Sequence, residues 1–201
     1  PVEAIEQVYI AGGFGRYLEL NVHATQRLLE AVVAAGNRAR GVYASSSSVY
    51  GNAARYPTTE DDLPLPHSPY GVTKLAAEHL TWLYWKNYGL PTVSLRYFTV
   101  YGPRQRPDMA FHRFIKAVLT GDRIRLFGDG AQSRDFTYVD DIVAANVAAA
   151  NGDVAGQVFN VGNAESATFT TTTPGLANVI SRVTGGSASQ INGPLRLVST
   201  G

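Results

Sequence analysis

Tyr70 and Lys74 are the side chains of this sequence whose types and spacing are best suited to chemistry. They stand four residues apart at the start of an expected helix, so both project from the same face of it. A tyrosine ordinarily titrates at about pH 10, and a lysine ammonium one turn away favours the phenolate and lowers the tyrosine pKa. The pair therefore predicts transfer of a proton to or from a hydroxyl group. Alternatively, the spacing arises by chance and means only an exposed aromatic ring near an exposed amine.

Four consecutive serines, residues 45–48, follow a strand that we expect over residues 40–45. Ligands of parallel sheets bind at the carboxyl ends of the strands, so these hydroxyls should lie at the mouth of a site. A serine hydroxyl beside a phenolate can share a proton with a substrate oxygen or donate one to it. A plain polar turn is the alternative. The position directly after a buried strand favours the functional interpretation.

The elements that would hold these side chains alternate between strands and helices. We expect the central strands to be apolar on both faces. Such strands indicate a parallel sheet covered by helices, and hence an α/β fold. We expect strands over residues 7–10, 40–45, 92–100, 123–127 and 158–161, and helices over residues 21–35, 70–88, 109–119, 140–150 and 176–183.

Composition excludes several classes of function. The 201 residues carry a formal net charge of +1, so we expect no strong attraction to nucleic acid or to a membrane surface. No stretch approaches the roughly 20 apolar residues that a membrane span needs. There is no cysteine, and the four histidines lack metal-binding spacing, so we expect neither a disulfide nor a metal site. These features suit a cytoplasmic protein.

Four motifs stand in order along the chain: residues 44–51 (ASSSSVYG), 68–74 (SPYGVTK), 95–103 (LRYFTVYGP) and 134–141 (RDFTYVDD). Together they resemble the extended short-chain dehydrogenase/reductases, in particular the NAD-dependent nucleotide-sugar epimerases and dehydratases. The resemblance runs from about residue 6 to about residue 162. It implies a partial Rossmann-type, NAD-binding domain over residues 1–101 and 134–150. It also implies a smaller, partial nucleotide-sugar-binding region over residues 102–133 and 151–201.

The resemblance implies roles for individual residues. Tyr70 would take the proton from the 4-hydroxyl of the sugar while NAD accepts hydride from C4. Lys74 would hold the nicotinamide ribose and lower the tyrosine pKa, and Ser46 would be the catalytic hydroxyl partner. The resemblance also implies that Asn21, Tyr97 and Phe98 contact the cofactor. Asn21 could instead be a helix N-cap, and the two aromatic residues, which belong to the 92–100 strand, could instead belong to the core. The implied cofactor contacts are Tyr70 and Lys74 together with Ala11, Gly12, Asn21, Ser45, Tyr97 and Phe98.

The residues before Val49 separate the branches of this family. Dehydratases carry an acidic pair there and decarboxylases carry a glutamate, whereas this chain has Ser47 and Ser48. The acid–base groups for elimination are therefore missing, and the resemblance favours a 4-epimerase with Ser46 and Ser47 at the substrate. A dehydratase or reductase of the same fold is the enzymatic alternative. A non-catalytic binding or dimerisation domain is another.

Three further residues match substrate contacts of the family. Thr99 and Arg106 match residues that surround the sugar carboxylate in UDP-glucuronate 4-epimerases, and a guanidinium suits bidentate carboxylate recognition. UDP-glucuronate is therefore favoured over UDP-glucose or UDP-galactose, although Arg106 could also belong to a solvated basic loop. Arg134 matches the arginine that binds the diphosphate, and its alternative is a salt bridge to Asp129 or Asp135.

Parts of the family pattern are missing from the sequence. The Gly-x-x-Gly-x-x-Gly finger that binds the cofactor pyrophosphate is absent, and residues 12–15 (GGFG) have a different spacing. The family's C-terminal segment, which completes the sugar pocket, is absent as well. We therefore expect either a piece of a longer protein or a truncated product. By resemblance, we also expect a homodimer formed through the helices at residues 21–35 and 70–88.

Overall fold

The computed structural model describes residues 13–36, 38–52, 57–126, 133–162, 166–168 and 197–199. Ala11, Gly12, the strand predicted at residues 7–10 and the helix predicted at 176–183 lie outside the described residues. The chain divides into two compact units, one of residues 1–98 with 140–162 and one of residues 99–139 with 163–201. These boundaries differ from those expected for the two functional regions, chiefly because residues 151–162 group with the first unit. The functional assignment of the two regions stays a prediction.

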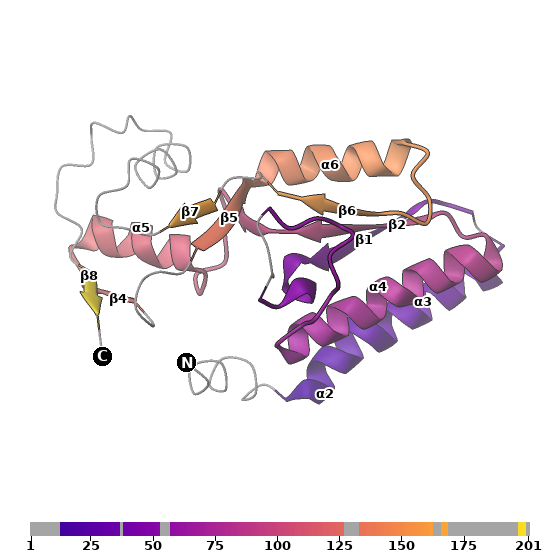
Figure 1. Ribbon diagram of the computed structural model, residues 1–201, viewed down its shortest axis with the longest axis horizontal. Coiled ribbons are helices and arrows are strands. Elements are labelled where there is room, and N and C mark those ends of the chain that lie inside the picture. The colour runs from indigo at the N-terminus through magenta and orange to yellow at the C-terminus, as the bar shows by residue number, and fades with distance from the viewer. Residues whose placement is uncertain are drawn as a thin grey trace. The chain divides into compact units, whose positions relative to one another are not determined.

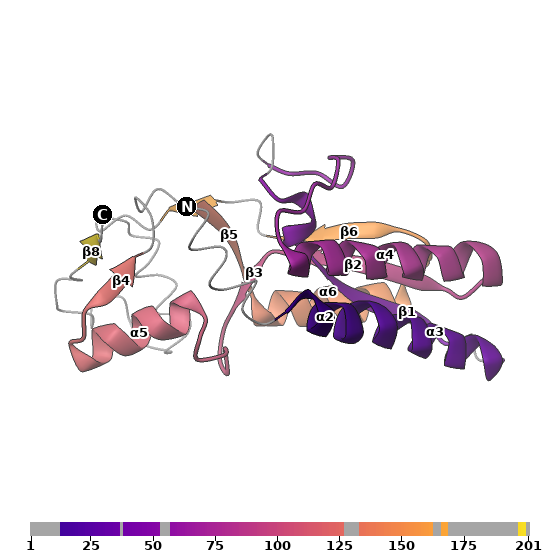
Figure 2. The same ribbon diagram turned by 90° about the horizontal axis from the view of Figure 1, so that it is seen from below.

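A parallel sheet of three strands forms the centre of the first unit. The strands are β1 (Gly41–Ser46), β2 (Thr92–Tyr97) and β6 (Val158–Val161), in the order β1-β2-β6. Helix α6 (Val139–Asn151) covers one face, and helices α3 (Ala24–Ala34) and α4 (Pro69–Tyr88) cover the other (Figure 1). Seen from below, α3 and α4 lie side by side (Figure 2). The predicted α/β fold, a Rossmann-type parallel sheet flanked by helices, is confirmed.

The central strand β2 has two different faces. Val93 and Leu95 are buried in a core cluster with Ala149 of α6. The alternate residues of β2 point to α4 and are polar: Thr92 donates to the carbonyl of Thr81 at 2.7 Å, and the hydroxyls of Ser94 and Thr81 lie 3.0 Å apart. The expectation of strands apolar on both faces is therefore wrong for β2, because its α4 face is packed through hydrogen bonds.

Local sequence explains where α4 begins and ends. Ser68 precedes it, and the Ser68 hydroxyl accepts a hydrogen bond from the backbone N–H of Gly71 at 3.1 Å. Pro69 occupies the first turn, where its missing N–H costs nothing. Gly89 ends the helix in the left-handed region, with φ 66°. These signals place Tyr70 in the first turn.

The other long helical segment begins earlier than predicted. It starts at Phe14 with α2 (Phe14–Tyr17), continues through a π-helical stretch, η1 (Leu18–His23), and then becomes α3. Asn21 therefore lies inside helical structure, with Gly13 before its first residue. The interpretation of Asn21 as an N-cap is wrong.

The second unit contains short strands and one helix. β3 (Thr99–Tyr101) pairs in parallel with β5 (Ser133–Tyr138), β5 pairs antiparallel with β7 (Ser166–Thr168), and β4 (Ile124–Leu126) pairs in parallel with β8 (Leu197–Ser199). Helix α5 (Ala110–Thr120) contributes Phe111, whose ring centroid lies 4.4 Å from that of Phe136. The strand predicted over residues 92–100 is thus two strands, separated at Phe98 and belonging to different units. Strand β5 was not predicted.

Gly51 provides a first test of this geometry. It follows the 3-10 helix η2 (Ser47–Tyr50) with φ 62° and ψ −125°. A Cβ at this position would overlap the carbonyl oxygen of Leu65 and lie 2.8 Å from Cδ2 of His67. We expect Gly51→Ala to lower the free energy of unfolding by about 2–5 kcal/mol, from backbone strain and steric overlap together. Urea denaturation measures this loss.

Gly36 is the matched control, because it also has φ 62° but nothing lies within 4 Å of an added Cβ. Gly36→Ala should cost only the left-handed conformation, about 1–2 kcal/mol. Equal losses for the two variants would contradict the close packing of Gly51 against residues 65–67.

Candidate active site

The carboxyl end of β1 lies against the first turn of α4. Ser46 is the last residue of β1 and is buried, and its hydroxyl caps η2 by accepting from the backbone N–H of Ser48 at 3.2 Å. A Cβ added to Gly71 would lie 2.5 Å from the carbonyl oxygen of Ser48, so only glycine allows this close approach. The structure therefore brings the serine turn, residues 45–50, against the turn of α4 that carries Tyr70.

Lys74 extends from α4 toward β1. Its Nζ donates to the carbonyl oxygen of Ala44 at 3.0 Å and lies 5.8 Å from the ring centroid of Tyr70. The same ammonium lies 5.3 Å from the ring centroid of Tyr43. Burial lowers the pKa of Lys74. A positive charge beside the Tyr70 ring is the arrangement that favours a phenolate there.

The helical segment that begins at Phe14 braces the start of α4. The rings of Tyr17 and Tyr70 meet edge to face, with centroids 5.9 Å apart. Nδ2 of Asn21 donates to the Thr73 hydroxyl at 3.0 Å, and that hydroxyl in turn donates to the carbonyl of Tyr70 at 3.0 Å. Asn21 lies in η1, and π-helical turns are frequent at functional sites. Its observed contact is to α4, and its contact with a cofactor stays a prediction.

The remaining predicted residues of the first unit have their own partners. The Ser45 hydroxyl is buried and donates to Oε2 of Glu78 at 2.6 Å, so it is already committed within the protein. The Tyr97 hydroxyl donates to Oδ1 of Asn146 at 2.8 Å, and its ring packs in the core beside β6. This supports the core interpretation of Tyr97. The backbone N–H of Phe98 donates to Val161, and Ser47 is half-buried at the start of η2.

Three predicted substrate residues, Thr99, Arg106 and Arg134, belong to the second unit. Thr99 begins β3 and is paired in register with Phe136 of β5. Arg106 is exposed and its Nη2 donates to Oδ2 of Asp108 at 3.0 Å. Exposed ion pairs of this kind hold a guanidinium weakly, so a ligand carboxylate could replace the aspartate. Arg134 lies exposed on β5.

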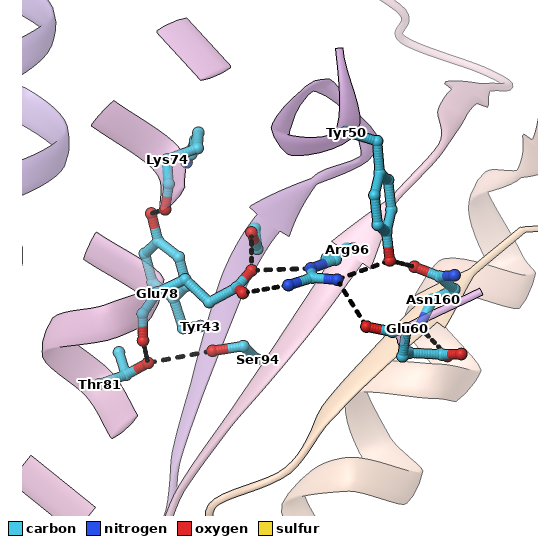
Figure 3. A network of polar contacts seen from close by, with 10 residues as sticks. Tyr43, Tyr50, Glu60, Lys74, Glu78, Thr81, Ser94, Arg96 and Asn160 are labelled. Carbon is cyan, nitrogen blue, oxygen red and sulfur yellow. Dashed lines mark hydrogen bonds and ion pairs between the residues drawn. The ribbon is translucent and has the colours of Figure 1, made fainter. Parts of the chain in front are cut away.

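A buried ion pair between Arg96 and Glu78 lies behind the serine turn, and sequence reasoning missed it. Nη2 of Arg96 donates to Oε1 of Glu78 at 2.6 Å, and Nε donates to Oε2 at 3.1 Å (Figure 3). Only 5% of Arg96 and 4% of Glu78 is exposed. The available signal was an arginine in an otherwise uncharged buried strand, because such a charge requires a buried partner.

This ion pair has further partners on neighbouring segments. Nη1 of Arg96 donates to the Tyr50 hydroxyl at 2.6 Å, and that hydroxyl donates to Oδ1 of Asn160 at 2.8 Å (Figure 3). The backbone N–H of Asn160 donates to Oε1 of Glu60 at 2.6 Å. Strands β1, β2 and β6, helix α4 and the loop at Glu60 are therefore joined beside the candidate site.

The residues that the structure describes provide neither a metal site nor a membrane span. In this part of the chain, no three His, Cys, Asp or Glu side chains are grouped so that they could hold a metal ion. Nor does any helix there have the length and apolar character needed to cross a membrane.

Known proteins resemble this chain over most of its length. Residues 14–162 match the model of the NAD dependent epimerase/dehydratase family. An uncharacterized UDP-glucose epimerase of Bacillus subtilis, YtcB, is 48% identical over 77% of this chain and 48% of its own length. The crystal structure of UDP-glucuronic acid 4-epimerase from Bacillus cereus in complex with NAD matches with a TM-score of 0.69 and 51% identity, over 74% of this chain and 48% of that one.

A further solved structure carries a different sugar. UDP-N-acetylglucosamine 4-epimerase from Methanobrevibacter ruminantium, in complex with UDP-N-acetylmuramic acid, has a TM-score of 0.71 and 38% identity, over 76% of this chain and 50% of that one. The chain thus spans about half the length of the relatives it matches.

Proposed function

Because the chain belongs to the NAD-dependent epimerase/dehydratase family, we propose that the gene product containing it is an NAD-dependent UDP-sugar 4-epimerase. UDP-glucuronate is the favoured substrate, and UDP-glucose or UDP-galactose comes next. The observation that carries the proposal is the position of Lys74 between β1 and the Tyr70 ring, directly beside a serine turn that contains no acidic residue.

NAD, when bound, would accept hydride from C4 of the sugar and later return it to the opposite face of that carbon. Tyr70 would take the proton of the 4-hydroxyl in the first step and return it in the second. The Lys74 ammonium would stabilise the phenolate formed in between. Ser46 would hold the sugar oxygen by a hydrogen bond. The serine turn offers no carboxyl group to protonate a leaving hydroxyl, which favours epimerisation over dehydration.

The described residues fit the nicotinamide end of this cofactor. A lysine ammonium has three N–H donors, and one of them is used on the carbonyl of Ala44, so donors remain for ribose hydroxyls. The Tyr70 ring lies beside that ammonium at the carboxyl end of β1, where ligands of parallel sheets bind. Lys74 would therefore hold the ribose beside the Tyr70 ring, and the phenol oxygen would remain for the sugar hydroxyl.

The assay that tests this function follows the sugar directly. The gene product that contains this chain is incubated separately with UDP-glucuronate, UDP-glucose and UDP-N-acetylglucosamine, and the sugar is observed by proton NMR. We expect the C4 epimer to accumulate to equilibrium with no net consumption of NAD or NADH. A 4-keto-6-deoxy product would instead identify a dehydratase, and stoichiometric consumption of NADH would identify a reductase. No conversion of any sugar, with no NAD retained on purification, would favour a binding domain.

Arg106 provides a test of the choice of sugar. Arg106→Ala should raise KM for UDP-glucuronate by about 10–100-fold, because charge-assisted hydrogen bonds to the carboxylate are lost. KM for UDP-glucose, which has no carboxylate, should stay within about threefold of wild type. Arg104→Ala is the control in the same exposed loop and should change neither value. Equal effects of Arg106→Ala on both sugars would contradict the recognition of a carboxylate.

The predicted homodimer would use the outer faces of α3 and α4. These helices expose apolar side chains, with 65% of Leu28, 47% of Trp82 and 41% of Leu83 accessible. We expect Leu28→Glu combined with Leu83→Glu to produce a monomer in light scattering coupled to gel filtration, since each would bury charge in the interface. Leu119→Glu introduces the same charge on α5, at a residue that is 76% exposed, and should leave the dimer intact. An unchanged mass for the double variant would exclude this interface.

A further inference from the structure

The serine turn is attached at both ends to the same ion pair. At its start, the Ser45 hydroxyl donates to Oε2 of Glu78 at 2.6 Å. At its end, the Tyr50 hydroxyl accepts from Nη1 of Arg96 at 2.6 Å (Figure 3). Ser46, the predicted catalytic hydroxyl, lies between these two attachments and caps the short helix that connects them.

The acidic partner belongs to the helix that carries the other catalytic groups. Tyr70, Lys74 and Glu78 are spaced four residues apart on α4, so they share one helix face. Lys74 bonds to Ala44 and Glu78 bonds to Ser45, which are consecutive residues at the end of β1. The helix face that presents Tyr70 therefore holds β1 directly before Ser46.

The basic partner extends the same arrangement to the next strand and loop. Arg96 stands opposite Ser45 in the register of β1 and β2. Its Nη1 also approaches the carbonyl of Glu60 at 3.5 Å, and the Tyr50 hydroxyl that it contacts is anchored to Asn160 of β6. The guanidinium thus contacts three segments around the serine turn: Nε and Nη2 donate to Glu78 of α4, and Nη1 is directed at Tyr50 and at the carbonyl of Glu60.

We propose that the buried Arg96–Glu78 ion pair is a positioning device that clamps the serine turn at Ser45 and Tyr50 and thereby fixes Ser46 relative to Tyr70. This inference deepens the proposed function and rests on it for the role of Ser46. Apolar side chains of similar volume often stabilise a buried site as well as an ion pair does. The contribution that apolar residues cannot replace is directional, because the Glu78 carboxylate accepts from Ser45 at one end of the turn and the Arg96 guanidinium donates to Tyr50 at the other.

The test uses two variants of the gene product and one control. Glu78→Leu combined with Arg96→Met removes the pair without leaving a buried charge. Tyr50→Phe removes the attachment at one end of the turn, together with the bond to Asn160, and keeps the ion pair, so it provides a second variant should the first misfold. Ser94→Ala is the control, because Ser94 bonds to Thr81 across the same α4–β2 interface without touching the serine turn.

Hydrogen exchange and steady-state kinetics provide separate readouts. We expect the amides of residues 46–51 to exchange about tenfold faster in the double variant, and faster to a smaller degree in Tyr50→Phe, while the interior amides of β2 are unchanged. We expect kcat of the double variant to fall by about 100-fold, with KM for the UDP-sugar within about threefold of wild type. Ser94→Ala should match wild type in both readouts.

The outcomes distinguish the positioning role of the ion pair from the proposed epimerase function. Unchanged amide exchange at residues 46–51 in both variants would overturn the positioning role. A kcat of the double variant no lower than that of Ser94→Ala would overturn it as well. A wild-type protein that converts no UDP-sugar would overturn the proposed function alone, because the exchange measurement needs no turnover and still decides whether the ion pair holds the turn.

Discussion

Replacing Tyr70 by phenylalanine is expected to lower kcat for the proposed epimerisation by about 10²–10⁴-fold, the range associated with loss of a general acid–base group. Only the phenol oxygen is removed. The edge-to-face contact with Tyr17 and the position of Lys74 over the ring do not require that oxygen. Affinities for NAD and for the UDP-sugar should therefore stay within about threefold of wild type, so that the loss is confined to the chemical step. Isothermal titration and single-turnover kinetics on the purified variant measure both quantities.

Tyr43 is the matched control, because Lys74 lies between two tyrosine rings. The ammonium is 5.3 Å from the Tyr43 ring centroid and 5.8 Å from that of Tyr70. Burial, with smaller contributions from Tyr70 and Glu78, raises the pKa of Tyr43 far above its ordinary value, so Tyr43 is unsuited to act as a base. Tyr43→Phe should keep kcat near that of wild type. A loss as large as that of Tyr70→Phe would contradict the assignment of Tyr70 as the base.

The parts of the fold that sequence predicted best are those determined by local signals. Ser68, Pro69 and Gly89 mark the two ends of α4, and this helix matches the predicted one closely. The strands at residues 40–45 and 158–161 were visible as short apolar runs between turn residues. The serine turn was located correctly because it follows such a run directly.

The failures come from contacts that a local pattern does not record. Gly13 and Gly15 made the start of the first helix look like a loop, and the helix therefore appeared to begin near Asn21. Strand β5 mixes charged and aromatic residues, and its pairing with β3 and β7 defines it. Arg96 and Glu78 are 18 residues apart, on a strand and a helix, so their ion pair appears only when the sheet and α4 are packed together.

In the candidate site, too, the features determined by local sequence were predicted and those determined by tertiary packing were not. The four-residue spacing of Tyr70 and Lys74 was sufficient to predict a shared helix face, and the structure places the ammonium beside the Tyr70 ring. The commitment of the Ser45 hydroxyl to Glu78 could not be predicted, because neighbouring serines in a turn differ only in the direction of their side chains. Direction at the end of a strand depends on the twist of the sheet and on what packs against it.

The ion pair should also have the largest effect on stability. Arg96→Met leaves the Glu78 carboxylate, only 4% exposed, without its cation, and we expect the free energy of unfolding to fall by about 3–5 kcal/mol. Such a loss is a large fraction of the roughly 5–15 kcal/mol that stabilises an ordinary domain. Glu78→Leu should cost a similar amount, because the Arg96 guanidinium would then be buried with only neutral partners, Tyr50 and the carbonyl of Glu60. Urea denaturation near neutral pH measures each loss.

The double variant separates the cost of an unpaired charge from the value of the pair. With both charges removed, only the Ser45 hydroxyl loses its acceptor outright, because Tyr50 keeps its bond to Asn160. We therefore expect the double variant to lose about 1–3 kcal/mol, less than either single variant, and the two substitutions to be strongly non-additive. Ser94→Ala, which leaves the Thr81 hydroxyl donating to the carbonyl of Glu78, should lose only about 1 kcal/mol. Additive losses for Arg96→Met and Glu78→Leu would mean that the two side chains do not interact in the folded protein. Non-additivity, with a double variant that is stable yet slow in turnover, would show that the pair is needed more for geometry than for stability.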